Sequence, residues 1–264
     1  EAKARGFSKV TTVAGGVTCR GGWPEVWRAN LEMRGASRVL VRIAEFRAPH
    51  LAQLDRRARR VEWDKFLRPK VPVMVEASSK RSKVYHTGAI RQRVEGALSE
   101  ELGVTIQPEA PICIRVRLDD DYCTISIDTS GDPLHKRGHK LAVNKAPMRE
   151  TMAAQFLLAC GYKAGDPVVD PMCGSGTIPI EAALWASNLA PGLTRDRFGF
   201  ERWANFGAEA DGDRVQLVVW DDGRGIDSQA VLRRAQLLDS SERNEIARKQ
   251  RGEGYFAGAL PAIM

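Results

Sequence analysis

The residues best suited to hold a ligand form the segment Asp170-Pro171-Met172-Cys173-Gly174-Ser175-Gly176-Thr177. A short apolar run that ends at Asp170 predicts a strand, and residues 178 to about 189 predict a helix. Gly174 and Gly176 let a ligand lie against the backbone, because a Cβ there would collide with the ligand or forbid the needed torsion angles. Backbone N–H groups at the helix start can then hold a carboxylate or another anion.

The spacing of this loop separates it from two common nucleotide-binding motifs. No Gly-Lys-Ser/Thr follows Gly176, so the loop does not match a phosphate-binding P-loop. Pro179 stands three residues after Gly176, where the G-x-G-x-x-G pattern needs glycine. The acidic residue at the strand end, the proline after it and the following helix make the loop more specific than a bare G-x-G.

Composition favours a folded globular protein. The 264 residues are 43% hydrophobic and 28% charged, enough for one large domain or two small ones. No run of about 18 apolar residues is found, so we expect no membrane span. The sequence begins with Glu1-Ala2 and has neither an initiator Met nor an apolar signal segment. This start is typical of the interior of a longer reading frame and predicts no secretion.

The five cysteines are dispersed along the chain without a C-x-x-C pair or a matching histidine cluster. We therefore expect no metal site, and the thiols suit a reducing cytoplasm. Cys113 and Cys123 flank an acidic turn and could face each other across a hairpin. Two separate core thiols are the interpretation we favour.

Positive charge is concentrated in one stretch. Between Arg47 and Arg93 there are 13 Lys or Arg and 4 Asp or Glu, a net of +9, which leaves −2 of the total +7 for the rest. A polyanion would gain from this surplus through neutralised phosphates and released counterions. The alternative is a solvated surface with no partner.

Hydrophobic periodicity predicts an α+β first half. The expected elements are a hairpin over 10–19, a helix over 24–33, strands over 38–46 and 71–76, helices over 49–61 and about 90–102, and a hairpin over 112–127. Ser130-Gly131-Asp132-Pro133 breaks the pattern. After it, a helix from Pro147 to Cys160, the strand before the loop, the loop helix and a strand over 215–220 predict the opening of a doubly wound sheet.

A wider pattern resembles the THUMP-containing class I RNA methyltransferases that modify guanine N2. It comprises Leu134-His135-Lys136-Arg137-Gly138-His139, Ala146-Pro147-Met148-Arg149-Glu150-Thr151, the loop with Ile180-Glu181-Ala182-Ala183, and the aromatic insert Phe198-Gly199-Phe200-Glu201-Arg202-Trp203. The first half is similar to the ferredoxin-like and THUMP regions of these enzymes, on Gly15-Gly16-Val17, Gly21-Gly22-Trp23 and Ser82-Lys83-Val84-Tyr85-His86-Thr87-Gly88-Ala89.

The resemblance implies an α+β N-terminal region followed by an incomplete α/β doubly wound, Rossmann-like methyltransferase domain. The implied domains are a ferredoxin-like segment (1–45), a THUMP-like RNA-binding domain (46–130) and a partial methyltransferase domain (131–264). The cofactor would be S-adenosyl-L-methionine and the partner rRNA or tRNA. The cofactor-binding residues would be Pro147, Thr151, Asp170, Pro171, Cys173, Gly174, Gly176 and Asp221.

The resemblance also implies side chains that grip RNA phosphates, which give position rather than base choice. These are Arg56, Arg57, Arg59, Arg60, Lys80, Arg81, Lys83, Arg91 and Arg93. Tyr85 and His86 could stack on a base, although packing at a strand end is the interpretation we favour for both. Glu181 would lie on the first crossover helix, and an ordinary solvated glutamate is an equal alternative.

Two features depart from the family. The sequence after the strand that ends near Asp221 differs from that of the family. The carboxylate of Asp221 is nevertheless suited to accept hydrogen bonds from ribose hydroxyls. The family's catalytic Asn/Asp-Pro-Pro-aromatic loop is absent, since no Pro-Pro occurs in the sequence. The catalytic residues are therefore unassigned, and we expect the chain as given not to methylate at a useful rate.

Other interpretations stay open. The chain could be a non-catalytic RNA-binding module, or a DNA adenine-N6 methyltransferase that shares the loop. Asp221-Asp222-Gly223-Arg224-Gly225-Ile226-Asp227 resembles a glycine box of the histidine-kinase-type ATPases, but the other motifs of those proteins are missing. The residues after about 213 could also be a non-native continuation, through a frameshift or truncation.

Overall fold

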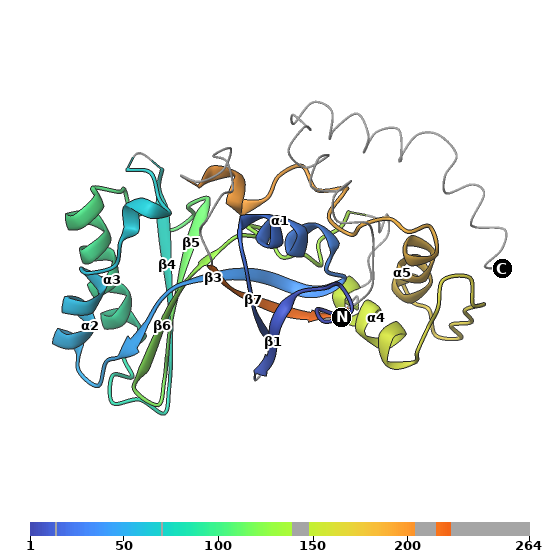
Figure 1. Ribbon diagram of the computed structural model, residues 1–264, viewed down its shortest axis with the longest axis horizontal. Helices are drawn as coiled ribbons and strands as arrows, with labels where there is room; N and C mark the ends of the chain where they lie inside the picture. The colour runs from blue at the N-terminus through green and yellow to red at the C-terminus, as the bar shows by residue number, and fades with distance from the viewer. Residues whose placement is uncertain (14, 70, 139–147, 204–214, 223–264) are drawn as a thin grey trace. The chain divides into compact units, whose positions relative to one another are not determined.

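A computed structural model describes residues 1–13, 15–69, 71–138, 148–203 and, for the backbone, 215–222. The chain divides into two compact units (Figure 1). The described part of the first unit is residues 1–39 and 132–198, and that of the second unit is residues 40–131 and 199–203, with the last strand shared between them. Pro147 and the residues after Asp222 lie outside the described residues, and with them the ATPase-like glycine box.

The second unit is built on strands β3 (Gly35–Arg47), β4 (Val73–Lys80), β5 (Ile112–Asp119) and β6 (Tyr122–Asp128). Their order is β3-β6-β5-β4, in which only the β4–β5 pair is parallel. The β5–β6 hairpin turns at Asp120 and Asp121, which both have positive φ. Along β5, Ile112, Ile114, Val116 and Leu118 are buried, as a strand with one core face requires. The predicted alternation is confirmed.

Helices α2 (Leu51–Ala58) and α3 (Thr87–Leu102) lie along one face of this sheet (Figure 1). Ile90, Val94 and Leu98 are fully buried at four-residue spacing, which puts them on one stripe of α3. Gly103 ends the helix in the left-handed region, with φ 67°, and its amide donates to the Ser99 carbonyl. A short 3-10 turn, η1 (Trp63–Lys65), joins α2 to β4.

The first unit begins with the hairpin β1 (Ser8–Val13) and β2 (Gly16–Gly21), followed by α1 (Trp23–Glu32). Its later residues form α4 (Glu150–Ala159) and α5 (Thr177–Ala186). Leu157 of α4 and Trp185 of α5 are buried against each other, together with Ala182. The predicted hairpin and all three helices are confirmed. The 3-10 turn η2 (Gly199–Arg202) belongs to the second unit.

The predicted strand before the loop is wrong for this structure. Residues 166–170 form no strand, and Val169 is 88% exposed. The predicted strand over 215–220 does form, as β7 (Val215–Asp222), but it is hydrogen-bonded between β2 and β3. A strand exists only where a neighbour satisfies its backbone groups, and no described segment pairs with residues 166–170.

All five cysteines are free thiols. Cys123 lies opposite Leu118 in the β5–β6 hairpin, whereas Cys113 lies beside Met74 of β4. The two thiols therefore do not face each other, and the interpretation as separate thiols is confirmed. Burial raises the pKa of Cys19 to about 11 and that of Cys123 to about 12.

Candidate cofactor loop and nucleic-acid-binding surface

The loop from Asp170 to Thr177 is folded by hydrogen bonds within itself. The Met172 amide donates to Oδ1 of Asp170 at 3.1 Å. The Gly176 amide donates to the Cys173 carbonyl at 2.7 Å. These short-range contacts turn the chain directly into α5, so five predicted cofactor residues (Asp170, Pro171, Cys173, Gly174 and Gly176) lie in one contiguous turn.

The backbone conformation favours glycine at two positions of this turn. Gly174 has φ 53° and Gly176 has φ 72°, a region that L side chains rarely adopt. A Cβ on Gly174 would meet no atom closer than 4.0 Å, and one on Gly176 would meet Ile180 at 3.6 Å. Neither Cβ would clash with the described chain, because the one at Gly176 would only reach van der Waals contact with Ile180. The residues fit a ligand that lies against the backbone.

Gly176 is also the N-cap of α5, and no side chain caps the helix. The backbone N–H groups of Thr177 and Ile178 are therefore available to an anionic group such as a carboxylate, whereas Pro179 has none, and the helix dipole favours negative charge there. The exposure of the turn supports this, since Met172 is 90% exposed.

Of the other predicted cofactor residues, only Thr151 has a described side chain. Thr151 of α4 is buried, and its Oγ1 lies 3.5 Å from Oγ of Ser37 at the start of β3. Pro147 lies outside the described residues, and so does the side chain of Asp221 on β7. Within the described residues, the structure therefore groups only the loop residues together.

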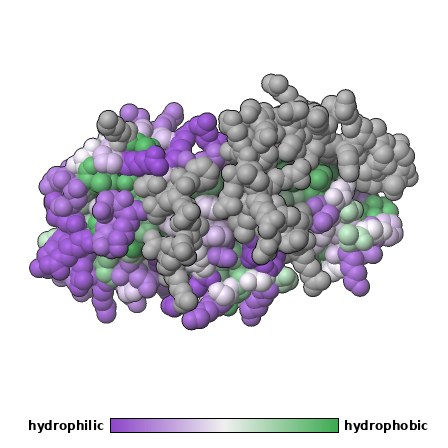
Figure 2. Space-filling model, turned by 45° about the horizontal axis from the view of Figure 1, so that its top comes forward, coloured by the Kyte–Doolittle hydropathy of each residue, from purple (hydrophilic) through white to green (hydrophobic). Residues whose placement is uncertain are grey.

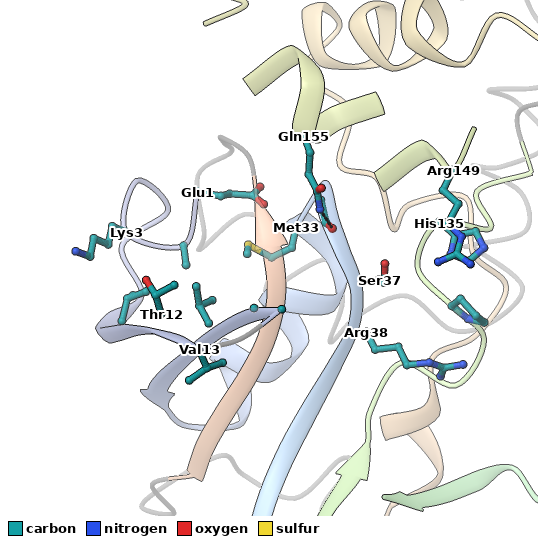
Figure 3. Close-up of a pocket in the computed structure, with 17 residues that line it drawn as sticks. Glu1, Lys3, Thr12, Val13, Met33, Ser37, Arg38, His135, Arg149 and Gln155 are labelled. Carbon is teal, nitrogen blue, oxygen red and sulfur yellow. Dashed lines mark hydrogen bonds between the residues drawn. The ribbon is translucent and has the colours of Figure 1, made fainter. Parts of the chain in front are cut away.

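A hollow of about 1090 Å³ in the first unit was not predicted from the sequence (Figure 3). Lys3 and Thr12 stand on one side of it, and Arg38, His135 and Arg149 on the other. No loop residue lines it. Its lining comes from segments more than 100 residues apart, so no local sequence pattern marks it.

Three buried charged side chains contact one another at α5, the helix that follows the loop. Glu181 of α5 is 0% exposed, and Arg34 and Arg137 are each 2% exposed. Arg137 donates from Nη1 to Oε2 of Glu181, and Nη1 of Arg34 lies 3.9 Å from the same oxygen. The alternative of a solvated glutamate at position 181 is therefore wrong. No sequence pattern marks Arg34 as a functional residue, because its partners on α5 lie about 150 residues away in the chain.

Arg34 also contacts the C-terminal end of α5. Its Nη2 donates to the carbonyls of Leu184, at 3.3 Å, and Leu189, and its guanidinium lies 5.6 Å from the ring centre of Trp185. A cation at this end of a helix is favoured by the helix dipole. Burial lowers the pKa of Arg34 to about 10, while the charge of Glu181 opposes that shift. The guanidinium remains protonated at neutral pH.

The predicted RNA-binding arginines of the second unit fall into two groups. Arg59 is held by carboxylates, at 3.0 Å from Asp55, 2.6 Å from Glu100 and 3.7 Å from Glu101. These partners raise its pKa, led by the hydrogen bonds that Arg59 donates to Glu100 and Asp55. Arg56, Arg57 and Arg60 are exposed and have no ion pair among the described residues. Figure 2 shows hydrophilic side chains gathered over the end that carries α2 and α3.

The same division holds around the N-terminus of α3. Arg81 pairs with Asp119 at 2.9 Å and Arg91 with Glu95 at 3.5 Å. Exposed cations without a charged partner in the described part of the chain are Lys80, Lys83 and Arg93. Tyr85 is 72% exposed, and its ring centre lies 4.9 Å from that of His86, which is also exposed. The favoured interpretation of both rings as packed at a strand end is wrong.

The described residues contain no group of three or more His, Cys, Asp or Glu arranged to hold a metal ion. Nor does any helix in these ranges have the length and apolar character needed to cross a membrane.

Three protein families match the chain in succession. Residues 1–40 match the RlmL ferredoxin-like domain, residues 49–128 the THUMP domain, and residues 137–249 the RMKL-like methyltransferase domain. A similar curated protein is the ribosomal RNA large subunit methyltransferase K/L of Syntrophotalea carbinolica, 37% identical over 84% of this chain and 31% of that protein. The chain thus spans under a third of that relative's length.

Solved structures of methyltransferases are also similar to the chain. A predicted N6-adenine-specific DNA methylase from Listeria monocytogenes is 33% identical over 72% of this chain and 52% of its own, with a TM-score of 0.66. SMU.472, a methyltransferase complexed with SAH, is 28% identical over 85% of this chain and 55% of its own, with a TM-score of 0.63. Its segments match, in order, a ferredoxin-like domain, a THUMP domain and a methyltransferase domain, and the chain is homologous to the ribosomal RNA large subunit methyltransferases K/L.

Proposed function

We propose that this chain binds S-adenosyl-L-methionine at the loop 170–177 and is part of an enzyme that methylates an exocyclic amino group of RNA, guanine N2 of rRNA or tRNA. The observation that carries the proposal is the glycine turn at the uncapped N-terminus of α5, inside the segment that matches the methyltransferase family. When bound, the cofactor supplies an electrophilic methyl group on a sulfonium.

The proposed roles follow from the chemistry of each group. The first amides of α5 bind the carboxylate of the methionine part, and the glycines at 174 and 176 allow its close approach. Asp170, Pro171 and Cys173 complete the turn. Pro147, Thr151 and Asp221 are proposed as further cofactor contacts, with Asp221 accepting hydrogen bonds from ribose hydroxyls. No residue of this chain is assigned to the transfer step.

RNA is the proposed partner of the second unit. The supporting observation is a set of exposed cations that have no carboxylate partner among the residues that the structure describes: Arg56, Arg57, Arg60, Lys80, Lys83 and Arg93. Such cations are free to neutralise phosphates and release counterions. Arg59, Arg81 and Arg91 are proposed as weaker contributors, because each is already paired. We further propose domains at 1–45, 46–130 and 131–264, and a cytoplasmic location that suits free thiols.

A binding experiment with two ligands tests this proposal. The chain and its Asp170→Ala variant are titrated with S-adenosyl-L-methionine, and separately with a labelled RNA stem-loop and a DNA duplex of the same sequence at several salt concentrations. We expect both ligands to bind, with RNA preferred over DNA and only cofactor binding lost in the variant. RNA binding without cofactor binding would instead favour a non-catalytic RNA-binding module, and a preference for DNA would favour an adenine-N6 enzyme.

A further inference from the structure

The position of the cofactor loop depends on the helix behind it. Within the described part of the chain, the hydrogen bonds of residues 170–177 stay inside the loop or continue into α5. The loop is therefore not tied to the rest of the first unit by hydrogen bonds of its own. Whatever fixes α5 also fixes the amides that the loop presents.

The apolar side of α5 gives only part of this fixation. Ala182 and Trp185 pack with Leu157, and Ile178 is only partly buried. Apolar contacts have no preferred direction, so they resist a small shift of the helix less than hydrogen bonds do. A buried ion pair is different, because a displaced partner leaves an uncompensated charge in a medium that solvates it poorly.

The buried charges attach α5 at two points along its length. Glu181 accepts from Arg137 near the middle of the helix, and Arg137 donates from Nη2 to the backbone carbonyl of Arg34. Arg34 in turn donates to the Leu184 and Leu189 carbonyls at the C-terminal end. These contacts restrict both the shift and the rotation of α5. The loop is joined to the free N-terminal end of this helix, so its position follows that of α5.

We propose that Glu181 is a positioning residue for the cofactor site, and that it holds α5 against Arg137 and Arg34 so that the loop amides stay in register with the cofactor. The inference rests on the proposed function, because it takes the loop 170–177 as the binding site. Arg34 lies in the segment that matches the ferredoxin-like domain, and Glu181 in the segment that matches the methyltransferase domain. The ferredoxin-like region therefore contributes to the cofactor site through Arg34.

Amide hydrogen exchange on the chain without ligand tests the inference directly. Glu181→Gln keeps the size of the side chain and removes its charge. Asp196→Asn makes the same chemical change at an exposed position of the same unit and serves as the control. We expect Glu181→Gln to speed exchange at the hydrogen-bonded amides of Gly176 and Ile180, where the loop joins α5, by about tenfold or more, and at α1 by less than about twofold.

Two results would overturn the inference. An equal acceleration over α1 and the loop would show that Glu181 only stabilises the unit as a whole. Unchanged exchange at the loop would show that the helix is fixed without it. If Glu181→Gln does not fold, Arg34→Lys replaces it. This variant keeps the cation but cannot reach both carbonyls and Glu181 together, so a local acceleration of about threefold is expected and a uniform one again overturns the inference.

A second measurement separates this inference from the proposed function. S-adenosyl-L-methionine is titrated into the parent chain, Glu181→Gln and Asp196→Asn. We expect the dissociation constant to rise about tenfold for Glu181→Gln alone, as misplacement of a binding loop predicts. An unchanged constant for Glu181→Gln contradicts the inference. If the parent chain does not bind the cofactor, the proposed function fails, and the exchange result still decides whether Glu181 positions the loop.

Discussion

Arginine–carboxylate pairs occur in both units, but their surroundings differ. In the first unit, Glu181 meets Arg137 and Arg34 with almost no exposure to solvent. In the second unit, Arg59 meets Glu100 at 2.6 Å, yet the Arg59 side chain is 32% exposed and that of Glu100 is 63% exposed. Water screens and competes for the second pair but hardly reaches the first.

The contrast suggests a division of labour between the two units. Buried charges hold elements in one arrangement, because every departure leaves a charge poorly solvated. Exposed charges contribute little to the fold, so those without a partner remain available to a ligand. The first unit is therefore suited to hold a small cofactor at a fixed loop, and the second to bind a flexible polyanion.

Removal of one buried charge should have the largest effect. Arg137→Met leaves Glu181 without its closest partner and should lower the free energy of unfolding by about 3–5 kcal/mol, as for other broken buried pairs. Arg59→Met should cost much less, because water already solvates and screens its ion pairs. Urea denaturation followed by tryptophan fluorescence measures both. Equal losses in the two variants would remove the distinction between the pairs.

Thiol reactivity extends the comparison to uncharged groups. Cys160 and Cys173 are exposed, whereas Cys19 and Cys123 are buried with raised pKa values. With a pKa of about 12, only about 1 in 10,000 molecules carries the Cys123 thiolate at pH 8. In the folded chain, iodoacetamide should therefore modify Cys160 and Cys173 at least about 100-fold faster than it modifies Cys19 and Cys123. Mass spectrometry of timed samples identifies each site.

The cofactor adds a control to this measurement. S-adenosyl-L-methionine should protect Cys173, which lies in the loop, and leave the rate at Cys160 unchanged. Protection of both thiols or of neither would argue against cofactor binding at the loop.

Neutralisation of unpaired cations should have a smaller effect, confined to RNA affinity. Replacing Arg56, Arg57 and Arg60 by Ala should weaken RNA binding about tenfold and reduce the slope of log K against log salt by about 2, if each contacts one phosphate. Arg59→Ala should change the slope by less than the single replacement of Arg56, Arg57 or Arg60 by Ala does. Fluorescence anisotropy at several salt concentrations gives both values, and a larger effect from Arg59→Ala would reverse the assignment.

The pH dependence of stability should show the smallest effect. Burial raises the pKa of Glu32, although Arg5 and Arg28 oppose the shift. A carboxyl whose pKa is higher in the folded state loses stability as pH rises from its unfolded value through its folded value. Glu32→Gln should therefore become more stable relative to the parent as the pH rises above 4.5. Urea denaturation at each pH measures the free energy of unfolding of both proteins. A decrease in the stability of Glu32→Gln relative to the parent with rising pH would contradict the prediction.

Sequence patterns predicted the second unit well because its signals are local. The alternation over 112–127 and the four-residue spacing of Ile90, Val94 and Leu98 each need only neighbouring positions. The glycine turn was also predictable, since positive φ at two nearby positions requires glycine.

Contacts between distant segments could not be predicted in this way. Arg137 lies 44 residues from Glu181 and 103 from Arg34 along the chain. The pairing of Arg59 rather than Arg57 depends on Glu100, 41 residues away. The strand expected before Asp170 failed for the same reason, because its apolar residues say nothing about which segment would pair with them.

Calorimetric titration of S-adenosyl-L-methionine into the chain and into Asp170→Ala tests most directly whether the loop at the start of α5 is the cofactor site. We predict saturable binding with one site per chain, and a dissociation constant at least about tenfold higher for Asp170→Ala, because the loss of its carboxylate removes the bond that folds the turn. No binding at millimolar cofactor, or equal binding by both proteins, would contradict the account.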